Sequence, residues 1–285
     1  MAFSAAACDV RVGDKGGVFV DVDPRGRAED RSTLTFPLAK GGQIELHTDD
    51  SNIEIVRAAG TSVEVRSRRV IRAGTDAEAR KLLEQQPVTV EATPDRVIIR
   101  TVKADGPEAR RRRGRVNYRL AVPVGSIVTA RNENGGVTLD NVEGRFVIRS
   151  TNGGVEGKAV SGGFDIEIVN GEVVLQVNSL TSDLRVKTVN GDIVLGLPKN
   201  VNGTIGATSV NDALMLDDGL PVVSPTRDRG SLFARLGTGA GPRIDLQSTN
   251  GAVQLGVEGR RGELNRRYNP ARKEVPGWVV WRSQP

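Results

Sequence analysis

Apolar and polar residues alternate along most of the chain, in short runs that are separated by turn-forming residues. From about Leu34 onward the apolar positions fall two residues apart, as in Ile44 and Leu46 or Ile53 and Ile55. A period of two is that of a β-strand with one face buried and one face in solvent. The pattern therefore predicts an all-β protein.

One segment departs from this alternation. In TDAEARKLLEQQP, Thr75 lies three residues before Glu78, which is a capping box, and Pro87 stops the run. Ala79 and Leu82 fall on one side of the helix that would result. Residues 75–86 are therefore expected to form one short helix in the N-terminal half, after which strands resume.

A short phrase then recurs, in which an Asn-Gly pair precedes a valine-rich run. The first four Asn-Gly pairs begin at Asn134, Asn152, Asn170 and Asn190, and the last begins at Asn250. Between them, Asn211-Asp212 and Arg229-Gly230 occupy equivalent places, so successive repeats are 18 to 21 residues apart. Asn and Gly adopt positive φ at low cost and are typical of tight corners. Self-similarity at about 20 residues is typical of a solenoid. The predicted structural corners are Asn134, Gly135, Asn152, Gly153, Asn170, Gly171, Asn190, Gly191, Asn250 and Gly251.

A second turn lies about halfway through each repeat, so each repeat contains two short strands. Apolar residues such as Val137 and Leu139 occupy one side of these strands, and polar residues occupy the other. We expect a β-helix/solenoid or β-prism-like coil of about seven rungs, each of 18–21 residues. The alternative is an antiparallel meander or sandwich in which every Asn-Gly pair closes a hairpin. The consistent difference between the two turns favours the coil.

Composition and pattern divide the chain into four parts. Residues 1–32 are an N-terminal segment, and residues 33–125 are a β region that contains the helix. The Asn-Gly solenoid follows at 126–258, and residues 259–285 form a C-terminal tail or cap. Trp278 and Trp281 in this last part are candidates for a docking segment or for a cap over the last open rung.

The 40 basic residues outnumber the 35 acidic ones by five, and much of this excess lies in a single run. Such a run is typical of contact with phosphate, lipopolysaccharide or acidic lipid, and also of a solvated loop between two strands. The candidate anion-binding residues are Arg110, Arg111, Arg112, Arg113 and Arg115.

Cys8 is the only cysteine, so the chain has neither an internal disulfide nor a cysteine cluster for a metal. The residues before it, Ala6 and Ala7, match the end of a signal peptide and of a bacterial lipobox, but the basic start and longer apolar core are missing. We therefore expect an extracytoplasmic protein, in the periplasm or at the cell surface, with an incomplete signal peptide. Cys8 is a candidate lipidation site, and that lipid would be its contact with a membrane.

The order of features between Leu34 and Gly256 is distinctive. The segment GTDAEARKLLEQQPVTVEATPDRVIIRTV is followed by VP, then by serial NG-V-L repeats, and then by LGTGAGPRIDLQSTNGAVQLG. This order resembles the bacterial putative adhesin family of unknown function, whose members carry a β-helical repeat domain. The resemblance implies an exported or envelope-associated protein with no established enzymatic activity and no catalytic residues. The arginine run and the tail after Gly256 depart from the family pattern.

Other candidates for chemistry are weak. His47 is the only histidine and is predicted to face solvent, so no histidine-rich metal site exists. Asp165 and Glu167 lie two apart on one strand, whereas paired catalytic carboxylates flank a substrate across a cleft. We therefore predict no enzyme, no cofactor and no metal. The following carboxylates are expected to form turns rather than a calcium site: Asp49, Asp50, Asp192, Asp212, Asp217 and Asp218.

Two functions from different classes remain. The first is a non-catalytic extracytoplasmic β-solenoid, a putative adhesin or cell-envelope interaction protein, whose partner is an envelope component or surface polymer. The second is a cytoplasmic scaffold or nucleic-acid-associated protein that uses the basic run. Against the second, Tyr118 is the only aromatic residue near that run. A polysaccharide-degrading β-helix enzyme is less favoured, because the chain contains only two Trp and two Tyr for sugar stacking.

Overall fold

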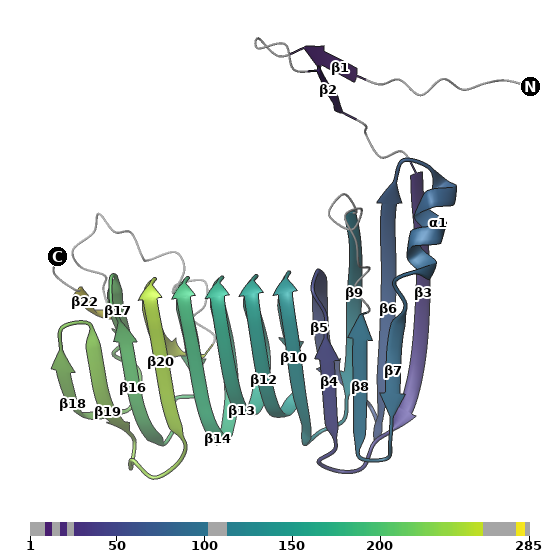
Figure 1. Ribbon diagram of the computed structural model, residues 1–285. Coiled ribbons are helices and arrows are strands. Elements are labelled where there is room, and N and C mark those ends of the chain that lie inside the picture. Colours follow the sequence, from purple (N-terminus) through teal and green to yellow (C-terminus); the bar gives the residue numbers. More distant parts are fainter. Residues whose placement is uncertain (1–8, 13–17, 22–25, 102–112, 259–277, 283–285) are drawn as a thin grey trace, which may run out of the picture.

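The computed structural model describes residues 9–12, 18–21, 26–101, 113–258 and 278–282. In these residues the strands wind into a flattened coil with two walls, accompanied by one short helix (Figure 1). The parallel strands of the first wall, in spatial order, are β8 (Arg96–Thr101), β4 (Gln43–His47), β10 (Ser126–Asn134), β12 (Glu143–Asn152), the second halves of β13 (Val155–Asn170) and β14 (Val173–Asn190), β20 (Arg243–Asn250) and β16 (Gly203–Ser209).

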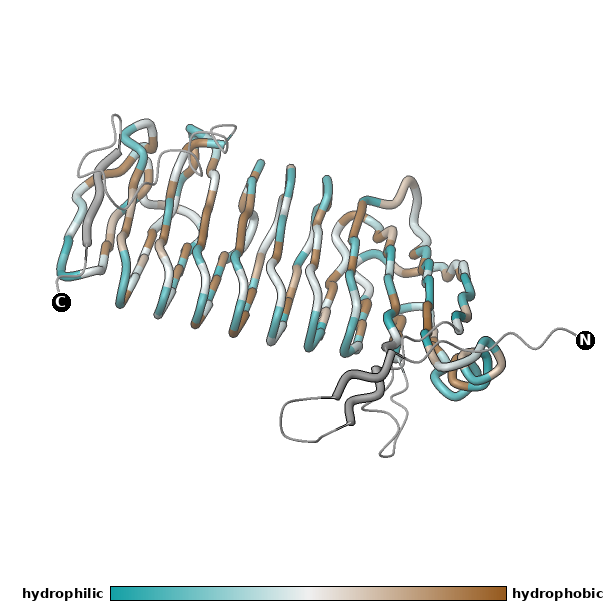
Figure 2. The backbone as a smooth tube through the Cα atoms, turned by 90° about the horizontal axis from the view of Figure 1, so that it is seen from above, coloured by the Kyte–Doolittle hydropathy of each residue, from teal (hydrophilic) through white to brown (hydrophobic). Residues whose placement is uncertain are grey.

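The second wall lies opposite the first, and its strands also run parallel to one another. In spatial order they are β9 (Arg113–Val122), β5 (Ser51–Arg57), β11 (Val137–Asp140), the first halves of β13 and β14, β15 (Ile193–Leu197), β21 (Val253–Val257) and β17 (Ala213–Asp217). We call one first-wall strand, together with the second-wall strand that follows it, a coil. Figure 2 shows the coils side by side along one axis.

Antiparallel strands extend both walls at the two ends of the solenoid. At the N-terminal end, β6 (Ser62–Ala73) and β3 (Gly26–Pro37) continue the second wall beyond β9, and β7 (Val88–Ala92) continues the first wall beyond β8. At the other end, β19 (Ser231–Leu236) and β18 (Val222–Asp228) continue the first wall, and β22 (Trp278–Arg282) pairs with β17. A separate hairpin consists of β1 (Asp9–Val12) and β2 (Val18–Asp21).

The parallel pairing confirms that the Asn-Gly repeats form a solenoid, and it excludes the antiparallel meander. In the pair β12–β13, Arg149 lies opposite Glu167, which is 18 residues further along the chain. Each of these repeats therefore stacks on the repeat before it. The second corner is a bend inside the long strands β13 and β14, with register shifts near Val160, rather than a separate turn.

The coils do not stack in chain order at either end, which differs from the simple series of repeats expected from the sequence. The coil β4–β5 lies next to β10–β11, although residues 58–125 separate them in the chain. At the other end, β20–β21 lies between β14–β15 and β16–β17. The expected corner at Arg229-Gly230 is instead the turn of the antiparallel hairpin β18–β19. A turn motif fixes where the chain bends but not which coil it stacks against.

The main core lies between the two walls. Leu46 of the first wall and Ile55 of the second are fully buried there, in one continuous apolar cluster. The expected alternation of buried and exposed residues holds in β10 and β12. It fails in β15, β17 and β21, where all five residues of each strand are buried. The buried outward-facing residues there include the apolar Val194 and Met215 and the polar Gln254.

The five Asn-Gly pairs lie where the chain passes from the first wall to the second, and their asparagines form a ladder. Nδ2 of Asn152 donates to Oδ1 of Asn134 at 2.9 Å, and the same bond recurs from coil to coil. All the bonds point in one direction and end on Asp50, which needs only to accept, so a carboxylate suits that place. In spatial order the ladder is Asp50, Asn134, Asn152, Asn170, Asn190, Asn250 and Asn211.

The predicted helix is present as α1 (Asp76–Glu84), which packs against β3 and β6. Oγ1 of Thr75 accepts from the backbone N–H of Glu78 at 3.2 Å, as the capping box predicts. At the other end of the helix, the guanidinium of Arg69 donates to the carbonyl oxygen of Leu83 at 2.9 Å. The helix thus covers the inner side of the β3–β6 pair and leaves the outer side of that pair uncovered.

Candidate functional site

The arginine run that the sequence singled out leads into the N-terminal end of the second wall. Arg110, Arg111 and Arg112 lie outside the described residues. Arg113 is the first residue of β9, and Arg115 is exposed on the same strand. The structure therefore places only the end of the predicted anion-binding run, and it places that end in a sheet rather than in a loop.

Strand β9 pairs with β6, and β6 pairs with β3, so the three strands form one continuous surface. Residues directly opposite each other in antiparallel strands point to the same side of the sheet. The register sets Arg66 opposite Arg119, and Arg68 opposite Arg31. We call the shared outer side the arginine face. Its described arginines are Arg27 and Arg31 of β3, Arg66, Arg68 and Arg72 of β6, and Arg115 and Arg119 of β9.

The alternation within each strand explains why the arginines gather on one side. In β6, Val65 and Ile71 are buried, and their neighbours Arg66 and Arg72 point the other way and are exposed. Arg69 is the exception, because it lies on the inner side, where it pairs with Asp30 and holds the end of α1. The same strand pattern that builds the core therefore builds a basic outer surface.

The described residues of the arginine face carry a net charge of +5. Two acidic residues, Glu29 and Glu64, share the outer side of these three strands with the seven arginines. Removing these nine residues from the totals of 40 basic and 35 acidic residues leaves 33 of each. The five excess positive charges of this three-stranded surface thus equal the formal net charge of the whole chain.

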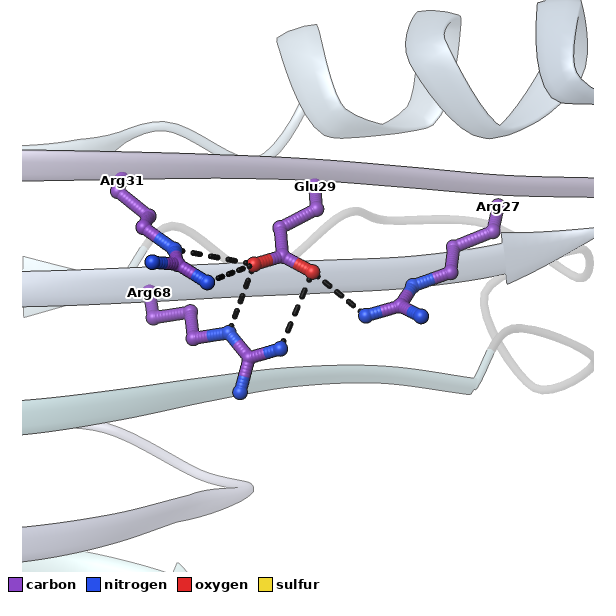
Figure 3. A network of polar contacts seen from close by, with 4 residues as sticks. All are labelled: Arg27, Glu29, Arg31 and Arg68. Carbon is purple, nitrogen blue, oxygen red and sulfur yellow. Dashed lines mark hydrogen bonds and ion pairs between the residues drawn. The ribbon is translucent and has the colours of Figure 1, made fainter.

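A single carboxylate organises three of these arginines (Figure 3). Glu29 accepts from Arg68 through Nε at 2.8 Å and Nη2 at 3.1 Å, from Arg31 at 3.0 and 3.1 Å, and from Arg27 at 2.5 Å. The hydrogen bonds from Arg68 and Arg31 lower the pKa of the Glu29 carboxyl to about 2 from its usual 4.5. One negative charge thus fixes three guanidinium groups, and two positive charges remain uncompensated.

The depressed pKa of Glu29 gives a testable pH dependence. Because this pKa is lower in the folded state, the network's contribution to stability is fully present above about pH 4.5 and is lost as the pH falls through about 2. We expect the side-chain carboxyl ¹³C resonance of Glu29 to titrate near pH 2. Arg68→Gln should raise that midpoint, whereas Arg145→Gln, on a distant first-wall strand, should leave it in place. An ordinary midpoint in the unchanged protein would contradict the network.

The remaining arginines of the face differ in how far they are paired. Arg66 pairs with Glu64 at 2.6 Å, and Arg119 pairs with Glu54 of the neighbouring strand β5. Arg72 and Arg115 are exposed, and neither has a side-chain hydrogen bond or ion pair to any other residue that the structure describes. These two are therefore the arginines most available to an external anion.

A second surface feature lies on the outer side of the first wall, away from the arginine face. It is a groove of about 840 Å³ that runs across β8, β4, β10, β12, β13 and β14. His47, predicted to face solvent, is partly exposed and lines this groove. Asp165 and Glu167 lie on the same side of β13, as expected, and both pair with Arg149, at 2.9 and 3.3 Å. This pairing gives the two carboxylates a structural role.

Buried hydroxyl groups lie beneath one end of the groove. Tyr118 and Thr101 share a hydrogen bond of 2.7 Å, Thr101 donates to Thr48 at 3.1 Å, and Thr48 lies 2.5 Å from the hydroxyl of Ser51. Burial raises the pKa of Tyr118 to about 12, against the opposing effects of Thr101 and Arg69. The phenol is therefore neutral at ordinary pH and serves to join the two walls.

One known family covers most of this fold. The sequence model of the Toastrack DUF4097 family matches residues 15–216, which is more than two thirds of the chain. The chain belongs to the Toastrack DUF4097 family. The family expected from the Asn-Gly repeats is thereby confirmed.

Solved structures of low sequence identity resemble the Toastrack chain. A putative cell adhesion protein from Clostridium sporogenes ATCC 15579 is 8% identical, with a TM-score of 0.45, over 81% of this chain and 100% of that one. A putative adhesin from Bacteroides fragilis NCTC 9343 is 9% identical, with a TM-score of 0.27, over 79% and 97%. A putative lipid binding protein from Parabacteroides distasonis ATCC 8503 is 7% identical, with a TM-score of 0.29, over 80% and 96%. No curated protein matches the chain.

Of the other candidates from the sequence, some lie within the described residues of the Toastrack structure and some lie outside them. Cys8 lies outside the described residues. The strand that carries Trp278 and Trp281 pairs antiparallel with β17, the last strand of the second wall's parallel series, which is the place expected of a cap. Within the described ranges, no cluster of three or more His, Cys, Asp or Glu is arranged to hold a metal. The same ranges contain no helix of the length and apolarity that a membrane crossing demands.

Sequence reasoning missed most of the arginine face. The run at 110–115 drew attention because its arginines are consecutive, whereas Arg66, Arg68 and Arg72 are separated by other residues. A usable signal was present, since arginines at even spacing on one strand must share a side. What the sequence did not show is that β3, β6 and β9 are neighbours, because Arg66 lies opposite a residue, Arg119, that is 53 residues further along the chain.

Proposed function

We propose that this Toastrack protein is a non-catalytic, extracytoplasmic, adhesin-like solenoid that binds an acidic polymer of the cell envelope on its arginine face. The observation that carries the proposal is the gathering of seven arginines with only two carboxylates on one open surface of three strands. The extracytoplasmic and non-catalytic parts rest on the family resemblance and on the Ala6-Ala7-Cys8 ending of the N-terminal segment.

The geometry of the face suits a ligand with many anionic groups. Same-side residues are about 7 Å apart along a strand and about 5 Å apart between strands, so the arginines form a grid. Each guanidinium presents a planar fork of donors that matches the oxygens of phosphate, sulfate or carboxylate. Glu29 holds three of the forks in fixed positions, which lowers the conformational entropy lost on binding. A repeating polymer can engage several forks at once.

The composition of the face favours recognition of charge over recognition of bases. Among the described side chains on the outer side of β3, β6 and β9, none is aromatic. Proteins that hold single-stranded nucleic acids usually stack the bases on aromatic rings. The arginine face offers no such stacking, so a charged envelope polymer fits it better than a nucleic acid.

The test is binding of the purified full chain to poly(glycerol phosphate) teichoic acid, measured over a series of salt concentrations. The variant Arg68→Gln/Arg72→Gln/Arg115→Gln removes three charges from the face. We expect at least about tenfold weaker binding at low salt, and a shallower dependence of log affinity on log salt, by about 2. A control variant with the same change of charge elsewhere is Arg145→Gln/Arg185→Gln/Lys199→Gln, whose three residues are all exposed.

The control variant should bind within about threefold of the unchanged protein, allowing for the long-range effect of net charge. Equal losses in the two triple variants would show that net charge alone binds the polymer and would overturn the proposed site. Binding to duplex DNA that is tighter than to teichoic acid at equal phosphate concentration would instead favour the nucleic-acid-associated alternative. Fractionation of host cells, with protease accessibility of intact cells, tests the location, and a protein confined to the cytosol would contradict it.

A further inference from the structure

The first wall carries a row of solvent-facing apolar residues that the proposed function does not use. Val169, Val189 and Val210 are 42%, 36% and 54% exposed, and they are three of the seven exposed large apolar residues in the part of the chain that the structure describes. The register of the parallel strands places all three in one row, together with Thr151 and Thr249. We call this row the valine stripe.

The valine stripe runs along the axis of the solenoid, across β12, β13, β14, β20 and β16, which lie side by side in Figure 1. Four steps between neighbouring strands give it a length of about 19 Å. The amides of the asparagine ladder border one side, because each stripe residue directly precedes a ladder asparagine. The charged row of Arg149, Glu167 and Lys187 borders the other side.

The groove of about 840 Å³ includes the first part of this stripe. Val169 and Val189, with the buried Ile168 at their base, line it at the β13–β14 end. Arg131 lines it at the β10 end, beside Arg149 in the register. The groove is therefore apolar at one end, and its other part is lined by two arginines, Arg100 and Arg131, and two carboxylates, Asp49 and Glu133.

The charges in the groove are compensated unevenly. Arg149 pairs with Asp165 and Glu167, and Arg100 pairs with Glu91 at 2.9 Å. Asp49 and Glu133 line the same part of the groove as Arg131, and each has an interaction partner of its own. Arg131 and Lys187 are exposed and have no side-chain hydrogen bond or ion pair to any described residue. An anion would meet an uncompensated guanidinium at the place where the apolar path begins.

The geometry points to a binding site for a single-chain acidic amphiphile of the fatty-acid type, with its head group on Arg131 and its chain along the valine stripe. Half the thickness of a bilayer's hydrocarbon core is about 15 Å, so a stripe of about 19 Å accommodates one acyl chain. Methyl groups along the stripe supply burial without aromatic residues, and the amide and charged borders confine the chain to one direction. The site is independent of the arginine face, which lies on the other wall.

Isothermal titration of the purified full chain with laurate, below its micelle concentration, tests the site. We expect saturable binding of one laurate for each chain. Val189→Ser and Arg131→Gln should each weaken binding at least about fivefold, because they remove apolar contact and head-group charge respectively. The matched controls are Val223→Ser, an exposed valine on β18, and Arg145→Gln, and both should stay within about twofold.

Two further probes separate the parts of the site. Butyrate keeps the carboxylate without the chain, and dodecyl maltoside keeps the chain without the charge, so both should bind at least about tenfold more weakly than laurate. Non-saturable uptake, or equal affinity for laurate in the stripe and control variants, would overturn the site. Sedimentation of the protein without ligand tests whether a second copy of the chain occupies the stripe. A dimer that Val189→Ser converts to a monomer would show this and would overturn the amphiphile site.

Discussion

Replacing Gly153 by alanine is expected to destabilise the solenoid by more than about 3 kcal/mol, which is a large part of the stability of a typical domain. Gly153 has φ of +138°, which an alanine adopts only with strain of about 1–2 kcal/mol. A Cβ at this position would also lie 2.2 Å from the carbonyl oxygen of Gly135, on the neighbouring coil. That atom belongs to the backbone and moves only if the two coils separate, so overpacking adds to the strain. The urea midpoint of unfolding measures the effect.

Two other glycines separate the causes. Gly125 has φ of +79° with nothing near its Cβ position, so Gly125→Ala should show the strain alone, about 1–2 kcal/mol. Gly206 has neither feature, and Gly206→Ala should be neutral or slightly stabilising. If Gly153→Ala were no worse than Gly125→Ala, the corners would have to admit a methyl group between coils, and close stacking would not be what selects glycine there.

The sequence allowed the local parts of this fold to be predicted, because those parts depend on neighbouring residues. The helix near Thr75 follows from its capping box, and the corners follow from Asn and Gly. The order of the coils does not follow, since stacking β20–β21 between β14–β15 and β16–β17 is a choice among equivalent apolar edges. The outward-facing Val194 departs from the expected alternation for a similar reason, because burial of its outer side depends on tertiary structure.

In the candidate site, too, features that depend on neighbouring residues could be predicted, and features that depend on strand pairing could not. The sequence drew attention to Arg115 because its basic neighbours are adjacent in the chain. The arginine face also needs Arg31 and Arg68, which meet through the pairing of β3 with β6 and share Glu29. The valine stripe was hidden differently. Val169 and Val189 each belong to an Asn-Gly repeat that was recognised, but valine is common in strands, and only the parallel register shows that the exposed valines align.

Truncating Phe164 to alanine is expected to cost about 3–5 kcal/mol, the other large effect in this fold. Phe164 and Phe146 lie opposite each other on neighbouring coils, at most 2% exposed, and their rings stack with centroids 5.5 Å apart and planes 12° from parallel. Few residues of the chain are aromatic, so aliphatic side chains surround this pair and would have to move to fill the space. The loss therefore combines the transfer free energy of the ring with that of a cavity.

Phe233 provides the control, because it is the same residue type at 55% exposure on β19. Phe233→Ala should change the free energy of unfolding by less than about 0.5 kcal/mol. Phe164→Leu, which keeps most of the volume, should fall between the two alanine variants. A cost below about 1 kcal/mol for Phe164→Ala would mean that the two walls close onto the vacated space. In that case the solenoid would be held together by its corners, and the glycine and asparagine ladders would account for most of its cohesion.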